Sequence, residues 1–170
     1  MVRVEHVLDT WRAVREDTAV AVEEFPAADF DFQPTPDVAT FRQIARHTLD
    51  AGDALAGALL AGEEDFHLPE VRAKFKEHYR PLEKECTPAE MAAALRQSVD
   101  RRTAQFAAKP TEFFEHLITR MDGLRVTRLE FLQFIKEHEL THRQQLFMYL
   151  RLKGMTPATT RRRMTRQAAK

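Results

Sequence analysis

The sequence has few of the residues that build disulfide-rich or β-rich proteins, and it has no net charge. It has one cysteine in 170 residues, Cys86, which excludes an intrachain disulfide framework and any metal site made of several cysteines. Five glycines and few β-branched residues beside Ala, Leu, Glu, Arg and Gln favour helices over sheets. The 26 Lys and Arg residues balance 26 Asp and Glu residues. The chain therefore lacks the overall basic charge typical of nucleic-acid-binding proteins.

Long hydrophobic runs are also lacking. No apolar run approaches the roughly 18 residues that a membrane span needs, and the least polar stretch, residues 51–62, is interrupted by Asp53. Residues 1–6 are charged and have neither the apolar core nor the cleavage site of a secretory signal. We therefore expect a cytoplasmic protein with no membrane or nucleic-acid partner. Its 44% hydrophobic and 31% charged residues are typical of a single folded domain.

Apolar residues that recur at three- and four-residue steps predict four long amphipathic helices. Three of these helices begin with a capping box, in which a threonine is followed three residues later by Glu or Gln. These pairs are Thr40 with Gln43, Thr87 with Glu90, and Thr127 with Glu130. The predicted helices span about residues 3–25, 40–62, 87–110 and 127–153. Four such helices in one domain predict an all-α four-helix bundle.

The segments between and after these helices are expected to differ from one another. Residues 63–86 are dense in charge and contain Pro69 and Pro81, which predicts a long crossover with one short helix over about 70–79. Asp122-Gly123 between two short runs predicts a β-hairpin, and a short helix over 112–118 is the competing interpretation. The basic segment 158–170 has no apolar anchor, so we expect a flexible, solvated tail after a domain spanning residues 1–157.

The last long helix carries the most informative pattern. Its predicted buried stripe consists of Phe131, Phe134, Ile135, Leu146, Tyr149 and Leu152. His138 and His142 lie in the middle of this stripe, with Gln145 beside them. Two imidazoles four residues apart share one helix face and can converge on one cation. Burying them costs free energy unless each has a partner, which is either a shared metal ion or the carboxylates and carbonyls that satisfy ordinary core histidines.

A third histidine favours the metal interpretation. His47 lies at the margin of the apolar stripe of the second helix, from where it can face the last helix. Three neutral imidazoles from two helices would hold a divalent cation and leave a position open, as in catalytic rather than structural sites. Imidazole ligands suit zinc, nickel, copper or iron(II).

Two runs of sequence resemble the DinB/YfiT-like superfamily. One is His138-Glu139-Leu140-Thr141-His142 with the residues that follow as far as Pro157, and the other is residues 41–47, which end at His47. The resemblance implies a four-helix bundle, usually dimeric, with a divalent metal on His47, His138 and His142. Gln145 matches the pattern and implies either a hydrogen bond to an imidazole or a packing role, whereas Gln144 stands where glycine is common.

Some members of the superfamily are transferases or isomerases that use low-molecular-weight thiols. The resemblance therefore implies a small-molecule metalloenzyme, with zinc or nickel the expected ion, that activates a thiol or water for transfer, isomerisation or hydrolysis. The alternative is a non-catalytic, metal-stabilised module of a dimeric stress-response protein. The other four histidines, His6, His67, His78 and His116, are expected to be ordinary. Cys86 is expected to be inert, Trp11 to anchor the core or an interface, and Arg46, Arg128, Arg143 and Arg151 to be solvated or paired at the surface.

Overall fold

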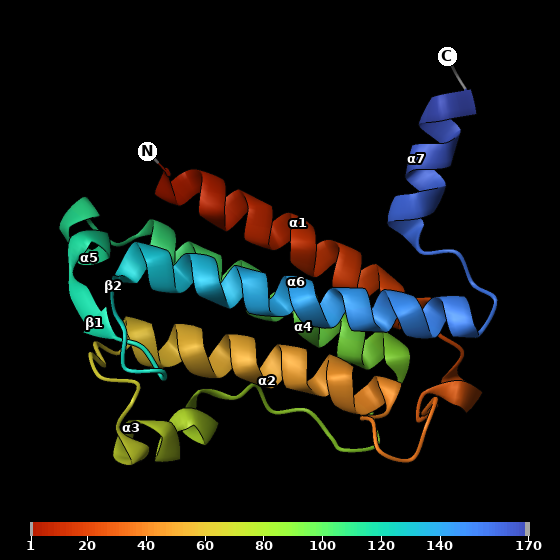
Figure 1. The fold of residues 1–170 in the computed structure, drawn as a ribbon, viewed down its shortest axis with the longest axis horizontal. Coiled ribbons are helices and arrows are strands. Elements are labelled where there is room, and N and C mark those ends of the chain that lie inside the picture. The colour runs from red at the N-terminus through yellow and green to blue at the C-terminus, as the bar shows by residue number, and fades with distance from the viewer. Residues whose placement is uncertain (1, 169–170) are drawn as a thin grey trace.

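The structure is a computed structural model that describes residues 2–168. Helices dominate it, and a small antiparallel sheet precedes the last long helix (Figure 1). In chain order the elements are α1 Val4–Glu23, the 3-10 helix η1 Ala27–Asp29, α2 Phe41–Leu60, α3 Pro69–Ala73, the 3-10 helix η2 Phe75–His78, α4 Pro88–Ala107, α5 Thr111–Glu115, β1 Leu117–Thr119, β2 Arg125–Thr127, α6 Arg128–Leu152 and α7 Ala158–Ala168.

The four long helices form the predicted bundle. Helix α1 contacts α4 and α6, and α2 contacts the same two helices, so α1 and α2 lie at diagonal corners. Helices α1 and α6 run in one direction and α2 and α4 in the other (Figure 1). The segment between α2 and α4 therefore has to return along the length of the bundle, as the predicted long crossover.

The capping boxes begin the helices where the sequence predicts. At Thr40, Thr87 and Thr127 the threonine side chain accepts a hydrogen bond from the backbone amide three residues on, and the Gln or Glu there accepts one from the threonine amide. Each box satisfies two backbone donors that would otherwise lack partners. Local sequence therefore fixes the starts of α2, α4 and α6.

The connecting segments contain more structure than predicted. The crossover has two short helices, α3 and η2, in place of one over 70–79. The hairpin is confirmed, with Ile118 paired to Val126, and Gly123 adopts the positive φ of 83° that its turn requires. The competing helix is also present in part, because α5 directly precedes β1.

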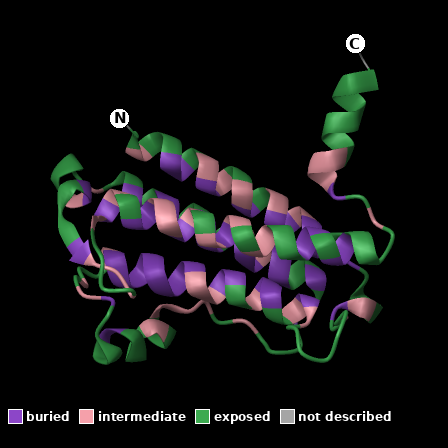
Figure 2. Cartoon of the chain, viewed as in Figure 1, coloured by how far each residue is buried: buried purple, intermediate pink, exposed green. Residues whose placement is uncertain are grey.

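The prediction of a frayed tail is wrong for residues 158–168, which form helix α7. Pro157 precedes this helix, and its residues include neither glycine nor proline. Arg162 forms an ion pair with Asp17 of α1, and Arg161 forms one with Glu24, the residue that follows α1. The helix has no buried residue and extends away from the bundle (Figures 1 and 2), so its solvated character agrees with the prediction.

Two hydrophobic clusters fill the bundle, one toward each end. Trp11 is fully buried, as expected for a core anchor. One prediction fails, because Leu152 is 58% exposed. Arg128 is 8% exposed rather than solvated, but it is paired as the alternative expected: its guanidinium lies 3.6 Å from exposed Glu64 and over the ring of Phe113. Between the clusters lies a layer of buried polar side chains, which includes Arg15, Thr18, Thr48, Asp53, Ser98 and Glu139.

Candidate metal centre

Three histidines from two helices converge at the level of the polar layer. His47 comes from α2, and His138 and His142 come from consecutive turns of α6. Each offers a ring nitrogen, and the three atoms lie within 4.8 Å of one another. The Nε2 atoms of His138 and His142 are 3.1 Å apart. The predicted convergence of His47 on the pair in α6 is therefore present.

The cluster lies at the edge of the bundle rather than in its core. His47 is exposed, and His138 and His142 are partly buried. This corrects the prediction that the α6 pair lies in the middle of the buried stripe. The stripe instead passes through Ile135 and Glu139, four residues apart, so the two histidines flank it on the side that faces α2 and solvent.

Glu139 is the residue that the sequence analysis missed. Its side chain is 2% exposed, and Oε1 accepts a hydrogen bond of 2.6 Å from Arg15 Nε while Oε2 accepts one of 2.7 Å from Trp11 Nε1. A His-Glu-x-x-His sequence on a helix is typical of metalloproteases in which the glutamate acts as general base. Here both carboxylate oxygens are engaged inside the core, so Glu139 does not serve the cluster as a base. Arg15 lies on the apolar face of α1, one turn after Trp11. An arginine at such a position in the sequence could have predicted a buried acidic partner.

Gly52 makes room for this buried pair. A Cβ atom at this position of α2 would lie 2.6 Å from Nη2 of Arg15. The guanidinium therefore reaches from α1 against the backbone of α2 while it binds Glu139 of α6. The contact ties together the three helices around the histidine cluster, at the same level of the bundle.

Two of the three histidines, His47 and His138, are held in the neutral form that a metal ion requires. Burial, together with the nearby imidazoles of His142 and His47, lowers the pKa of His138 to about 4. Burial and then the charge of His142 lower the pKa of His47. A metal binds only the neutral imidazole. At neutral pH His138 and His47 therefore need to lose no proton before binding.

Gln145 contacts one of the three rings. Its Oε1 lies 2.7 Å from Nδ1 of His142. An amide oxygen can only accept, so this contact requires a proton on Nδ1, and Nε2 is the ring atom that faces Nε2 of His138. Packing was the other role expected for Gln145, and its exposed side chain favours the hydrogen-bonding role.

The donor set fits a divalent transition-metal ion. Zinc–imidazole bonds of about 2.0–2.1 Å in tetrahedral geometry place neighbouring donor atoms about 3.4 Å apart, close to the separation of the His138 and His142 Nε2 atoms. No carboxylate belongs to the cluster among residues 2–168. Three neutral ligands leave the full charge of the ion in place and a coordination position open.

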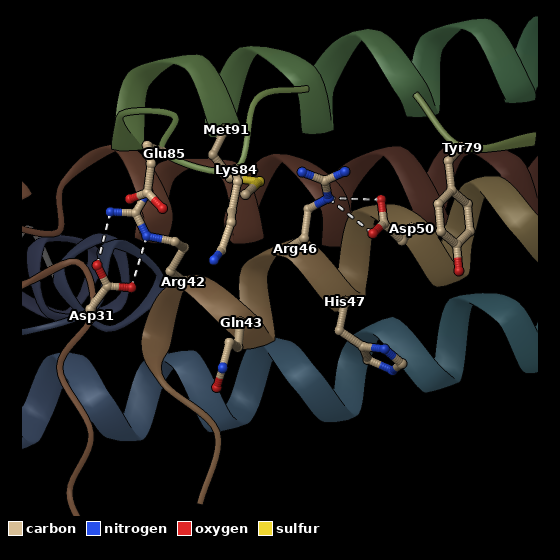
Figure 3. A pocket seen from close by; sticks show the side chains of 10 residues that line it. All are labelled: Asp31, Arg42, Gln43, Arg46, His47, Asp50, Tyr79, Lys84, Glu85 and Met91. Atoms are coloured by element: carbon tan, nitrogen blue, oxygen red, sulfur yellow. Dashed lines mark hydrogen bonds and ion pairs between the residues drawn. The ribbon is translucent and has the colours of Figure 1, made fainter. Parts of the chain in front are cut away.

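Three cavities meet at His47. The largest, about 520 Å³, lies between α2 and the crossover and is lined by charged residues that include Arg42, Arg46 and Lys84 (Figure 3). A second cavity, of about 380 Å³, also borders His142 and Gln145, and a third, of about 230 Å³, borders His138. The second and third cavities have mainly apolar walls, which include Met148 in the second and Phe75, Met121 and Phe134 in the third.

The remaining candidates behave as ordinary residues. Outside the cluster, His116 contacts Glu64, and His67 contacts the carbonyl of Met121. Cys86 is buried, and burial raises the pKa of its thiol, which agrees with the expected inert role. Arg46 and Arg143 form partly buried ion pairs with Asp50 and Asp17. No helix among residues 2–168 combines the length and the apolar character of a membrane span.

Comparison with known proteins agrees with this fold. The chain matches the model of the DinB family over residues 1–169. No curated protein matches it in sequence. Among solved structures, a DinB-like protein from Bacillus subtilis is similar with a TM-score of 0.69 and 19% identity, covering 89% of this chain and 94% of that one.

Two further structures are similar over most of this chain. YfiT from Bacillus subtilis, described as a probable metal-dependent hydrolase with an unusual four-helix bundle topology, has a TM-score of 0.61 and 18% identity and covers 92% of each chain. A mycothiol-dependent maleylpyruvate isomerase has a TM-score of 0.62 and 16% identity and covers 85% of this chain and 61% of that one. Identities this low establish a shared fold and leave function to the site itself.

Proposed function

Since the chain belongs to the DinB family, we propose that it is a metal-dependent enzyme in which His47, His138 and His142 hold a divalent ion. The reaction is the activation of a thiol or water for transfer, isomerisation or hydrolysis of a small molecule. The observation that carries this proposal is the convergence of three imidazole nitrogens within 4.8 Å, with no carboxylate among them. Zinc and nickel are the expected ions.

The chemistry divides between the ion and the protein. A divalent ion on three imidazoles lowers the pKa of a bound thiol or water and so supplies a nucleophile near neutral pH. Gln145 orients His142, and the three cavities around His47 provide room for a substrate. Glu139 stays in the core and takes no part in proton transfer.

Two of the similar structures each support one form of the proposed reaction, with a thiol or with water as the activated molecule. One is a mycothiol-dependent isomerase, which favours a low-molecular-weight thiol as cosubstrate. The other, YfiT, is described as a probable metal-dependent hydrolase, which favours water. A homodimer stays a prediction of the family resemblance.

Metal analysis of the purified protein tests the site. We expect about one divalent ion per chain, lost in His47→Ala, His138→Ala and His142→Ala while circular dichroism shows unchanged helical content. His6→Ala is the matched control, because His6 is exposed and lies outside the cluster. Full metal content in any of the three cluster variants would contradict the proposed ligand set.

Turnover distinguishes the enzyme from the non-catalytic module. The metal-loaded protein is incubated with a panel of thiols and electrophiles such as aryl halides, and with ester and amide substrates. We expect metal-dependent consumption of a thiol or release of a hydrolysis product, abolished in His142→Ala. Stoichiometric metal with no turnover on any substrate, and large destabilisation on metal removal, would favour the metal-stabilised module.

A further inference from the structure

Tyr79 lies beside the cluster, and its hydroxyl makes no hydrogen bond to another residue among residues 2–168. It follows η2 directly as its C-terminal cap residue and lines two of the three cavities that share His47, the charged one and the one that borders His138. Figure 3 shows its ring beyond Asp50, reaching from the crossover toward α2. The phenol therefore stands at the boundary between the two cavities.

The backbone on both sides of Tyr79 is held by arginines. Nη2 of Arg102 donates a hydrogen bond of 3.0 Å to the carbonyl of His78, and Nη1 of Arg46 donates one of 2.9 Å to the carbonyl of Leu82. Arg102 is itself fixed by buried Asp53, whose Oδ1 accepts from its Nε at 2.9 Å. Tyr79 is thus part of a fixed wall of the cavities.

A glycine lets this wall approach α2. A Cβ atom on Gly57 would lie 2.6 Å from Cγ of His78, so any other residue at position 57 would push η2 outward. Close contact of η2 with α2 brings the following residue, Tyr79, against the helix that carries His47. Packing and hydrogen bonds therefore act together to place the phenol beside the cluster.

The hydroxyl of Tyr79 itself has no hydrogen-bond partner among residues 2–168. The other tyrosine of the chain differs, because Tyr149 donates a hydrogen bond of 2.7 Å to the carbonyl of Ala39. A partly buried phenol usually finds a partner. A free one at the mouth of two cavities is available to a bound molecule as donor or acceptor.

We propose that Tyr79 is a ligand-binding residue of the centre, and that its hydroxyl donates a hydrogen bond to the anionic atom of a small molecule bound at the open position of the ion. The ligand class is a small anion such as a thiolate, a carboxylate or an oxyanion. This inference rests on the proposed function, because it requires a metal ion on the three histidines.

The test uses azide as the anionic probe of the cobalt(II)-loaded, full-length protein. Azide binding is followed by the change in the visible spectrum of cobalt in wild type, Tyr79→Phe and Tyr149→Phe. Loss of one hydrogen bond to a charged ligand predicts an azide affinity about 10-fold weaker in Tyr79→Phe. The affinity for cobalt and the spectrum of the azide-free protein should not change, because the phenol is not a metal ligand.

Tyr149→Phe is the matched control. It loses a hydroxyl of the same kind, close to the second cavity, but that hydroxyl is already engaged by Ala39. We expect it to lower the melting temperature and leave azide affinity unchanged. Equal azide affinity in Tyr79→Phe and wild type would overturn the inference alone, as would cobalt binding without any azide binding. Failure of wild type to bind cobalt would overturn the proposed function and the inference with it.

Discussion

Helix α6 presents two faces at the same level of the bundle, and the two faces differ in how deeply their side chains are buried and in what those side chains contact. On the inner face Glu139 is 2% exposed and meets Arg15 and Trp11. On the outer face the rings of His138 and His142 contact the ring of His47, and each of the two borders a cavity, the second for His142 and the third for His138. Neighbours in sequence, about 100° apart around the helix, thus belong to the core and to the candidate centre respectively.

This difference shows that the fold assigns stability and the candidate metal site to different faces of α6. Every hydrogen-bonding oxygen of the inner carboxylate is used, and removing one partner of such a buried pair is costly. The outer imidazoles form no ion pair with an acidic side chain among residues 2–168. The inner pair therefore sets the position of α6, and the outer histidines are left free to take an ion. The following predictions test this separation, from the largest effect to the smallest.

Glu139→Gln should have the largest effect, and it should fall on stability. The variant leaves the buried charge of Arg15 unpaired and is expected to lower the free energy of unfolding by about 3–5 kcal/mol. Urea unfolding measures this loss of stability. Glu137→Gln is the control, because Glu137 is exposed and its substitution should change the free energy of unfolding by less than about 0.5 kcal/mol. A folded Glu139→Gln variant should still bind metal. Complete loss of metal from a fully folded variant would break the separation of the two faces.

Adding metal should stabilise the protein through the outer face only. At a free concentration 100 times the dissociation constant, an ion that binds the folded state alone adds about 2.7 kcal/mol to the free energy of unfolding. Thermal melts with and without zinc or nickel measure the shift. It should be absent in His142→Ala, and a shift of equal size in that variant would place the ion elsewhere.

Gln145→Ala should weaken the centre without removing it. Groups that orient a metal-bound histidine typically contribute 10- to 100-fold to metal affinity, and Gln145 holds Nδ1 of His142. Competition with a chromogenic chelator measures the affinity. Gln144→Ala is the control, because that neighbouring exposed residue contacts no ring of the cluster. Affinities that are indistinguishable for the two variants would favour a packing role for Gln145.

The smallest effect is the pH dependence of the metal-free protein. The pKa of His138 is about 4 in the folded chain against 6.5 for the free side chain. Between these values the unfolded chain binds a proton that the folded chain does not, so stability falls as pH falls from 6.5 toward 4. Melts in EDTA from pH 7.5 to 6 measure the slope. His138→Gln should flatten it, and an unchanged slope would show that other groups control it.

The helices and the three histidines could be predicted because their signals are local. A capping box spans four residues, and the i, i+4 pair of α6 follows from the helical period alone. Glu139 could not be placed in the same way, because its partner Arg15 is 124 residues distant in sequence. The helix over 158–168 was missed for a related reason, since its ion pairs with Asp17 of α1 and with Glu24 at the end of that helix become visible only once the chain is folded.

What the sequence alone determined is the set of helices, their first residues and the three imidazoles that share two helix faces. Tertiary structure decided which side of α6 turns inward, and so which of the adjacent residues Glu139 and His138 is buried. It also decided that the crossover rests on Gly57 and brings Tyr79 beside His47. The physical reason is how far apart the interacting residues lie in the sequence. Backbone hydrogen bonds and caps act within about one helical turn, whereas the burial of a charge depends on a partner that only folding brings near.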